Sequence, residues 1–140
     1  MRYEELNEEL MLHFPEFQSI YKEQFDFWED TPPQHCFYAA ILNKFIANLL
    51  LENKEKVTIF KVFNFYEKMA QSDDIEVINL LQVTLLEYLW DNKIIFERAC
   101  QYMFPKTKEI NNLIGNYLRV PIAQTQPRRG GQIGCQRYSL

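Results

Sequence analysis

The stretch that decides the fold is IEVINLLQVTLLEYLW, residues 75–90. Nine of its sixteen residues are Ile, Val or Leu, and they lie on nearly every side of a helix with about 3.6 residues per turn. A helix that is apolar all round is typical of a segment covered by several neighbours. The stretch therefore predicts a buried central helix in an all-α domain.

Apolar residues follow the same helical period on both sides of this stretch, which predicts about seven helices between residues 3 and 118. Pro15, the loop Thr31-Pro32-Pro33, Asn53 and Asp91-Asn92 are the expected breaks. Because the connections are short, neighbouring helices are expected to pack antiparallel as helical hairpins. The expected segments are 3–14, 15–30, 34–52, 59–70, 75–90, 95–103 and 105–118.

Two local patterns refine this expectation. Residues 41–54 and 80–93 echo each other at a spacing of 39 residues, which is in the range of HEAT-type helical repeats. We therefore expect either a HEAT-like stack or an irregular bundle. In Ser72-Asp73-Asp74, Asp73 stands three residues before Glu76, as in a variant capping box at the start of the central helix.

The helical pattern ends after Arg119, which divides the chain into two parts. Residues 1–119 are expected to form a single all-helical domain. Residues 120–140 contain prolines, glycines and no apolar period, so they are predicted to be a flexible or extended, non-helical C-terminal tail.

Charge and composition exclude several classes of function. No apolar run approaches the roughly 18 residues that span a bilayer, and the N-terminal residues are acidic, unlike a signal peptide. We therefore expect no membrane contact. The three cysteines are an odd number without a Cys-x-x-Cys pair, which favours a reducing compartment, so we expect a cytoplasmic protein. Residues 1–30 contain nine acidic and two basic residues, which argues against nucleic acid and favours a basic partner.

The sequence carries no recognisable catalytic motif. It has no glycine-rich phosphate loop, and its two histidines, His13 and His35, are not part of a metal-binding pattern. We therefore predict no catalytic residue, no metal and no cofactor. Glu67 and Glu87 border apolar helix faces and are expected to be solvated or paired; a buried Glu87 would need a lysine or a tyrosine hydroxyl as its partner.

An alternative is a small helical enzyme or ligand-binding protein with a pocket between hairpins. Such a pocket would use Glu87, Tyr88 or the corner formed by His35 and Cys36. Adjacent residues on a helix point about 100° apart, so His35 and Cys36 could face one ligand only on an irregular backbone.

The remaining candidate is a surface that binds a protein. Aromatic residues are concentrated between positions 14 and 28, where one helical stripe cannot bury all of them. Aromatic side chains surrounded by charge are typical of protein-binding hot spots. The predicted partner-binding residues are Glu23, Asp26, Phe27, Trp28, Glu29 and, on the polar side of its helix, Phe65. One alternative is that a neighbouring helix covers these rings. Another is that the protein is a structural homodimer subunit without a further partner.

Several short patterns resemble those of small, uncharacterised all-helical bacterial proteins, some of which are similar to immunity proteins of polymorphic-toxin systems. The resemblance covers residues 3–119. It implies a cytoplasmic binder of a cognate partner, such as a toxin, and supplies no established catalytic residues. Together with the acidic N-terminal segment, it favours a basic toxin domain as the partner. The patterns are Phe14-Pro15, Phe65-Tyr66-Glu67-x-Met69 before Ser72-Asp73-Asp74, Leu85-Leu86-Glu87-Tyr88-Leu89, and Tyr102-Met103-Phe104-Pro105-x-Thr107-Lys108.

Overall fold

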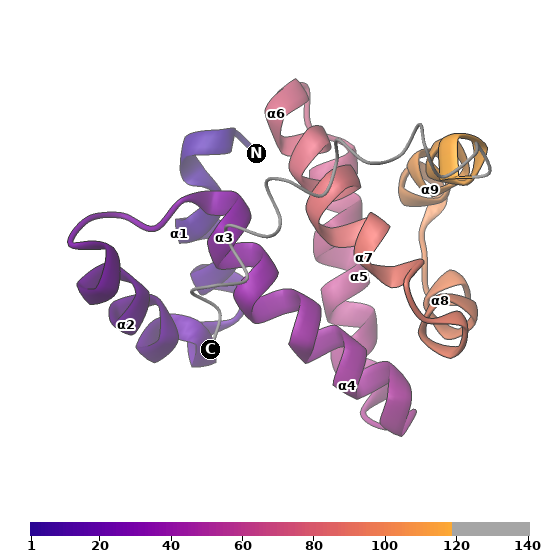
Figure 1. The fold of residues 1–140 in the computed structure, drawn as a ribbon, viewed down its shortest axis with the longest axis horizontal. Coiled ribbons are helices and arrows are strands. Elements are labelled where there is room, and N and C mark those ends of the chain that lie inside the picture. The colour runs from indigo at the N-terminus through magenta and orange to yellow at the C-terminus, as the bar shows by residue number, and fades with distance from the viewer. Residues whose placement is uncertain (119–140) are drawn as a thin grey trace.

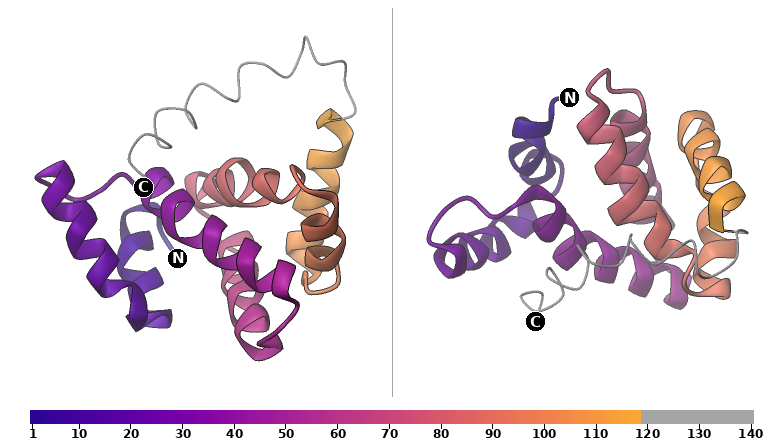
Figure 2. Two further views of the ribbon diagram at one scale, coloured as in Figure 1. Left: turned by 60° about the horizontal axis from the view of Figure 1, so that its bottom comes forward. Right: turned by 45° about the horizontal axis from the view of Figure 1, so that its top comes forward.

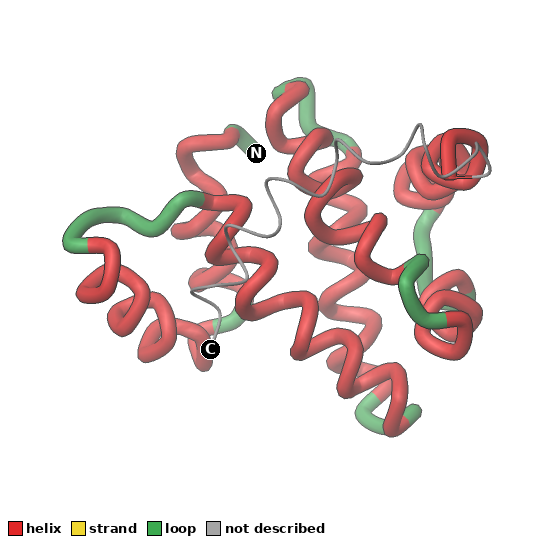
Figure 3. Tube along the Cα trace, in the orientation of Figure 1, coloured by secondary structure: helices red, strands yellow, loops and turns green. Residues whose placement is uncertain are grey.

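A computed structural model describes residues 1–118, and within them the chain forms seven continuous helical segments and no strand (Figures 1 and 3). Some segments combine α-helix with a 3-10 or π stretch. The first four are η1–α1 (Tyr3–Glu5, Leu6–His13), η2–α2 (Pro15–Phe17, Gln18–Trp28), α3–η3–α4 (Gln34–Tyr38, Ala39–Asn43, Lys44–Glu52) and α5 (Lys56–Ala70). The other three are α6–η4–α7 (Ile75–Leu80, Leu81–Leu86, Glu87–Leu89), α8 (Lys93–Cys100) and α9 (Pro105–Leu118).

Short turns join consecutive segments, so that the chain folds back on itself as predicted. α4 and α5 form one hairpin, and α6–α7 returns alongside α5 (Figures 1 and 2). Asn53 ends α4 in the left-handed conformation, with φ of 55°, and its N–H donates to the Leu49 carbonyl at 2.9 Å. This is the stop that the sequence predicted, since asparagine tolerates this conformation better than most residues.

The central helix is the one predicted from residues 75–90. Leu80, Leu81, Leu85, Leu86 and Leu89 are fully buried. The segment contacts η3, α5, α8 and α9, so neighbours cover several of its sides. Its first residue, Ile75, is exposed instead of buried, because the helix begins there at the surface.

The side chain that caps this helix is Asp74, one residue later than predicted. Its Oδ1 accepts from the N–H of Glu76 at 3.0 Å, and its Oδ2 accepts from the N–H of Tyr3 at 2.9 Å. These two hydrogen bonds lower the pKa of Asp74, because they stabilise the ionised carboxylate. Asp74 therefore starts the central helix and also holds the N-terminal segment beside it.

Two π-helical stretches were not predicted. η3 and η4 interrupt the third and fifth segments and contact each other where these helices cross. At the crossing, the Asn43 amide donates to the backbone carbonyl of Thr84 at 3.1 Å. Side-chain donors that satisfy backbone carbonyls are a usual accompaniment of irregular helical turns.

The predicted tail, residues 120–140, lies outside the described residues. Within residues 1–118, no helix is both long and apolar enough to cross a bilayer.

Candidate functional site

α2 is held to the rest of the domain mainly at its beginning. Phe14 and Phe17 are buried, and their rings stack at a centroid distance of 5.5 Å on either side of Pro15. Further along, the Tyr21 ring meets the edge of Phe37 at 5.1 Å. Pro15 has no N–H to satisfy, so it suits the first position of the new helical segment.

The helix itself lies at the edge of the molecule (Figure 1) and contains no buried residue. Ile20 is 37% exposed, Phe25 42% and Phe27 57%. An isolated helix shorter than about 12–15 residues is only marginally stable in water, and α2 has 11 residues. Burial of these apolar side chains against another surface would therefore stabilise α2.

Five of the six predicted partner-binding residues lie together on this helix and at its end. Glu23, Asp26 and Glu29 are exposed, and Phe27 contacts Trp28 edge to face at a centroid distance of 5.9 Å. The indole N–H of Trp28 donates to the Gln24 side chain at 3.3 Å. Ile20, Glu23, Gln24 and Phe27 also share one helical stripe, because they are spaced i, i+3, i+4 and i+7.

The sixth residue, Phe65, is buried and therefore cannot contact a partner. It was predicted to be exposed on the polar side of its helix, but only 1% of it is exposed. Its ring packs against His13 at 5.1 Å, Phe14 at 6.0 Å and Tyr38 at 6.3 Å. The first helix and α3 cover this side of α5, so Phe65 belongs to the core.

The two carboxylates on apolar helix faces are both buried and hydrogen-bonded. Glu87 is 3% exposed and accepts a hydrogen bond from the Tyr117 hydroxyl, which is one of the two partners expected for it. Glu67 was expected to be solvated or paired with a cation, but it is buried and accepts from backbone groups instead. Its carboxylate accepts from the N–H groups of Lys106 and Thr107 at the start of α9, at 3.1 and 2.9 Å.

His35, a residue of the alternative enzyme site, has a structural contact. The Nδ1 of His35 lies 2.6 Å from the Thr84 hydroxyl, beside the crossing of η3 and η4. Burial lowers the pKa of His35, and the negative charge of Glu76 partly opposes this shift. Among residues 1–118, no three His, Cys, Asp or Glu side chains are placed to hold a metal ion.

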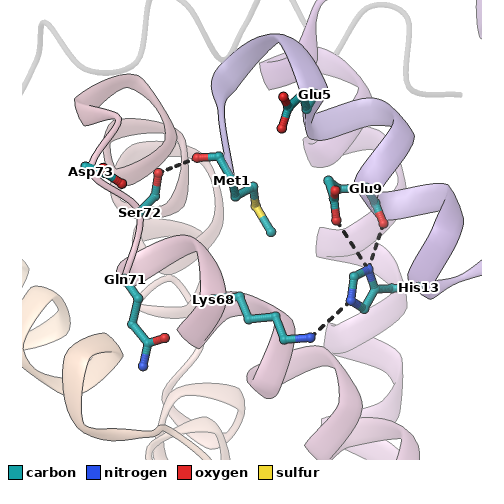
Figure 4. Close-up of a pocket in the computed structure, with 8 residues that line it drawn as sticks. All are labelled: Met1, Glu5, Glu9, His13, Lys68, Gln71, Ser72 and Asp73. Atoms are coloured by element: carbon teal, nitrogen blue, oxygen red, sulfur yellow. Dashed lines mark hydrogen bonds and ion pairs between the residues drawn. The ribbon is translucent and has the colours of Figure 1, made fainter.

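A pocket of about 380 Å³ lies between α1 and the end of α5 (Figure 4). Within it, the Nζ of Lys68 donates to the Nε2 of His13 at 3.2 Å, and the Nδ1 of His13 donates to the backbone carbonyl of Glu9 at 2.9 Å. The Oε2 of Glu9 lies 3.9 Å from the same Nδ1. The lining residues are Met1, Glu5, Glu9, His13, Lys68, Gln71, Ser72 and Asp73.

Sequence reasoning missed this pocket. Glu5, Glu9 and His13 are spaced i, i+4 and i+8, which places them on one helix face, but the same spacing is typical of a solvated surface. The other wall, from Lys68 to Asp73, lies more than 50 residues further along the chain. Nothing local in the sequence relates the two walls.

The chain matches a family of known proteins. No curated protein and no solved structure matches the chain. Residues 7–115 match a family described as "Domain of unknown function (DUF7674)". This match spans α1 to most of α9 and thus more than half of the chain. The chain belongs to the DUF7674 family.

Proposed function

We propose that this protein is a non-enzymatic, cytoplasmic binding module whose partner is a basic protein domain, and that it acts as an immunity protein which neutralises a cognate bacterial toxin. The single observation that carries the proposal is α2: a short helix without a buried residue, with exposed aromatic side chains among carboxylates. Large aromatic anchors with a charged rim are the usual composition of binding hot spots.

The charge of the chain supports a basic partner. Residues 1–30 have a large excess of acids, and Glu23, Asp26 and Glu29 place part of it on α2. A negative surface accelerates the encounter with a positive one and disfavours acidic partners. The toxin as partner is supported by the resemblance of short patterns in residues 3–119 to those of small all-helical bacterial proteins, some of which are similar to immunity proteins.

The test uses the full chain and the product of the neighbouring gene, which the proposal expects to carry a toxin-like domain. Charge reversal of Glu23, Asp26 and Glu29 to lysine should slow association and reduce its dependence on salt, because it removes electrostatic steering. Phe27→Ala should mainly raise the dissociation rate, because it removes an apolar anchor. Binding kinetics and protection of cells that express the toxin measure both effects.

Matched controls lie on the opposite side of the molecule. Charge reversal of Glu52, Asp91 and Glu97, which are exposed at the end of α4 and around α8, changes the net charge by the same amount. Phe60→Ala removes an exposed ring from α5. These controls should bind nearly as the natural chain does.

Two results would overturn the proposal. If the α2 variants stay folded and bind and protect like the natural chain, α2 is not the binding surface. If the chain neither binds the toxin-like domain nor protects the cell, the immunity function is wrong. Self-association of the chain that Phe27→Ala abolishes would show that α2 is a homodimer interface instead.

A further inference from the structure

The pocket beside α1 carries more negative than positive charge. Glu5, Glu9 and Asp73 contribute three carboxylates to its lining, against the ammonium group of Lys68 and the terminal amine of Met1. The three carboxylates outnumber the two amines, and the Glu9 carboxylate also lies 3.9 Å from the Nδ1 of His13. Glu8 is exposed nearby on the same N-terminal segment and extends the negative potential outwards, whereas Glu4 forms an ion pair with Arg2 at 2.6 Å.

The ammonium group of Lys68 is held at the side of the pocket. Figure 4 shows the Lys68 side chain extended towards the His13 ring, to which its Nζ donates at 3.2 Å. The ring is fixed in turn by its bond to the Glu9 carbonyl and by its edge contact with buried Phe65. The ammonium group is therefore directed to His13.

The two walls of the pocket are tied together, so that the pocket exists before any ligand binds. The Ser72 hydroxyl donates to the carbonyl of Met1 at 2.5 Å, and Tyr3 N–H donates to Asp74 at 2.9 Å. These bonds join the N-terminal segment to the turn between α5 and α6. A preformed site binds more tightly because little conformational entropy is lost on binding.

We propose that this pocket receives a basic side chain, arginine above all, from a protein partner. The planar guanidinium group has five N–H donors and pairs with carboxylates more effectively than an ammonium group does. The volume of about 380 Å³ is within the range of roughly 300–1,000 Å³ found for ligand pockets. The inference rests on the proposed function in one respect: a protein with a basic surface supplies the side chain.

The first experiment needs no partner, so its failure is distinct from failure of the proposed function. Nuclear magnetic resonance of the full, isotope-labelled chain follows a titration with N-acetyl-arginine amide. The amide signals of His13, Ser72 and Asp73 should shift and saturate, with a dissociation constant of roughly 1–10 mM. The lysine analogue should bind more weakly, and the uncharged citrulline analogue should cause no saturable shift.

Substitutions then identify the pocket as the site. Glu9→Gln combined with Asp73→Asn should raise the dissociation constant of the arginine probe about tenfold, since it removes two charge-assisted acceptors. The matched control is Glu4→Gln combined with Glu8→Gln, which changes the charge equally on exposed residues outside the lining. The control should change the constant by less than about twofold.

Three results would overturn the inference: no saturable shift with the arginine probe, equal binding of the citrulline probe, or equal loss of affinity in the control variant. Thermal melting of each variant shows whether it remains folded. If the double substitution unfolds the chain, Asp73→Asn alone replaces it, because Asp73 is exposed in the turn between α5 and α6. An unchanged constant in that variant contradicts the proposed role of Asp73.

Discussion

The carboxylate of Glu67, on α5, accepts hydrogen bonds from both the backbone N–H and the hydroxyl of Thr107, each at 2.9 Å. Thr107 stands in the first turn of α9, where backbone N–H groups have no partner within the helix. A negative charge at this end also interacts favourably with the helix dipole. A side chain 40 residues away thus caps α9 and fixes its position on α5.

Removing this cap should destabilise the domain. Glu67→Ala leaves several buried donors unsatisfied, and we expect it to lower the free energy of unfolding by about 2 kcal/mol or more. Thr107→Val removes only the hydroxyl bond and should cost about 1 kcal/mol. Urea unfolding measures both, with exposed Glu109→Gln as the control. Equal stability of Glu67→Ala and the natural chain would contradict the capping role.

The central helix should be the most sensitive part of the core. Leu85→Ala or Leu89→Ala creates a cavity where the side chain is fully buried, and each should cost about 2–5 kcal/mol. Leu113→Ala, at an exposed position of α9, should change stability by less than about 0.5 kcal/mol. Thermal or urea unfolding of the three variants tests this order. A cost below about 1 kcal/mol for both core variants would mean that α6–η4–α7 is not the centre of the fold.

Gly115 should resist even the smallest substitution. A Cβ at this position would lie 3.0 Å from Cη2 of Trp90, whose indole N–H donates to Asn111 at 3.0 Å. Gly115→Ala gains about 1 kcal/mol of helix propensity but displaces this ring, so a net loss of about 1–2 kcal/mol is expected. Asn116→Ala, at the exposed neighbouring position, should be neutral or stabilising. A more stable Gly115→Ala would show that α9 shifts freely away from Trp90.

Stability should fall in mild acid because of His35. Its folded-state pKa is lowered from the usual value of 6.5, so the unfolded chain binds the proton more readily than the folded one. This contribution is fully present above about pH 6.5 and is lost as the pH falls through the lowered folded-state pKa. Urea unfolding at several values between about pH 7.5 and about pH 5 measures how the free energy of unfolding depends on pH. This dependence should be weaker in His35→Gln than in the natural chain. Identical slopes would mean that His35 titrates alike in both states.

Helix boundaries could be predicted where the determining interactions are local. The segment from Gln34 to Glu52 begins and ends where the sequence places it, because Pro33 precedes it and Asn53 adopts the left-handed conformation after it. Burial of the segment starting at Ile75 was also predictable, since apolar residues surround most of that helix. These features depend on residues close together in the chain.

Features that depend on distant residues could not be predicted. Phe65 lies among Lys61, Asn64 and Lys68, so its sequence neighbours suggest exposure, and only the packing of α1 and α3 buries it. The pocket requires Lys68 to meet His13, 55 residues earlier in the chain. The two π stretches likewise meet at Asn43 and Thr84, which are 41 residues apart in the chain.

The π stretches η3 and η4 bear on how the length of this chain can change during evolution. A π turn holds one residue more than an α turn, so losing a single residue within Ala39–Asn43 or Leu81–Leu86 can convert it to regular helix without rotating the rest of that helix. The same deletion inside α5 would turn every later residue by about 100° and expose the apolar stripe. Single-residue gaps between related sequences should therefore accumulate at these two crossing stretches and be rare elsewhere in the helices.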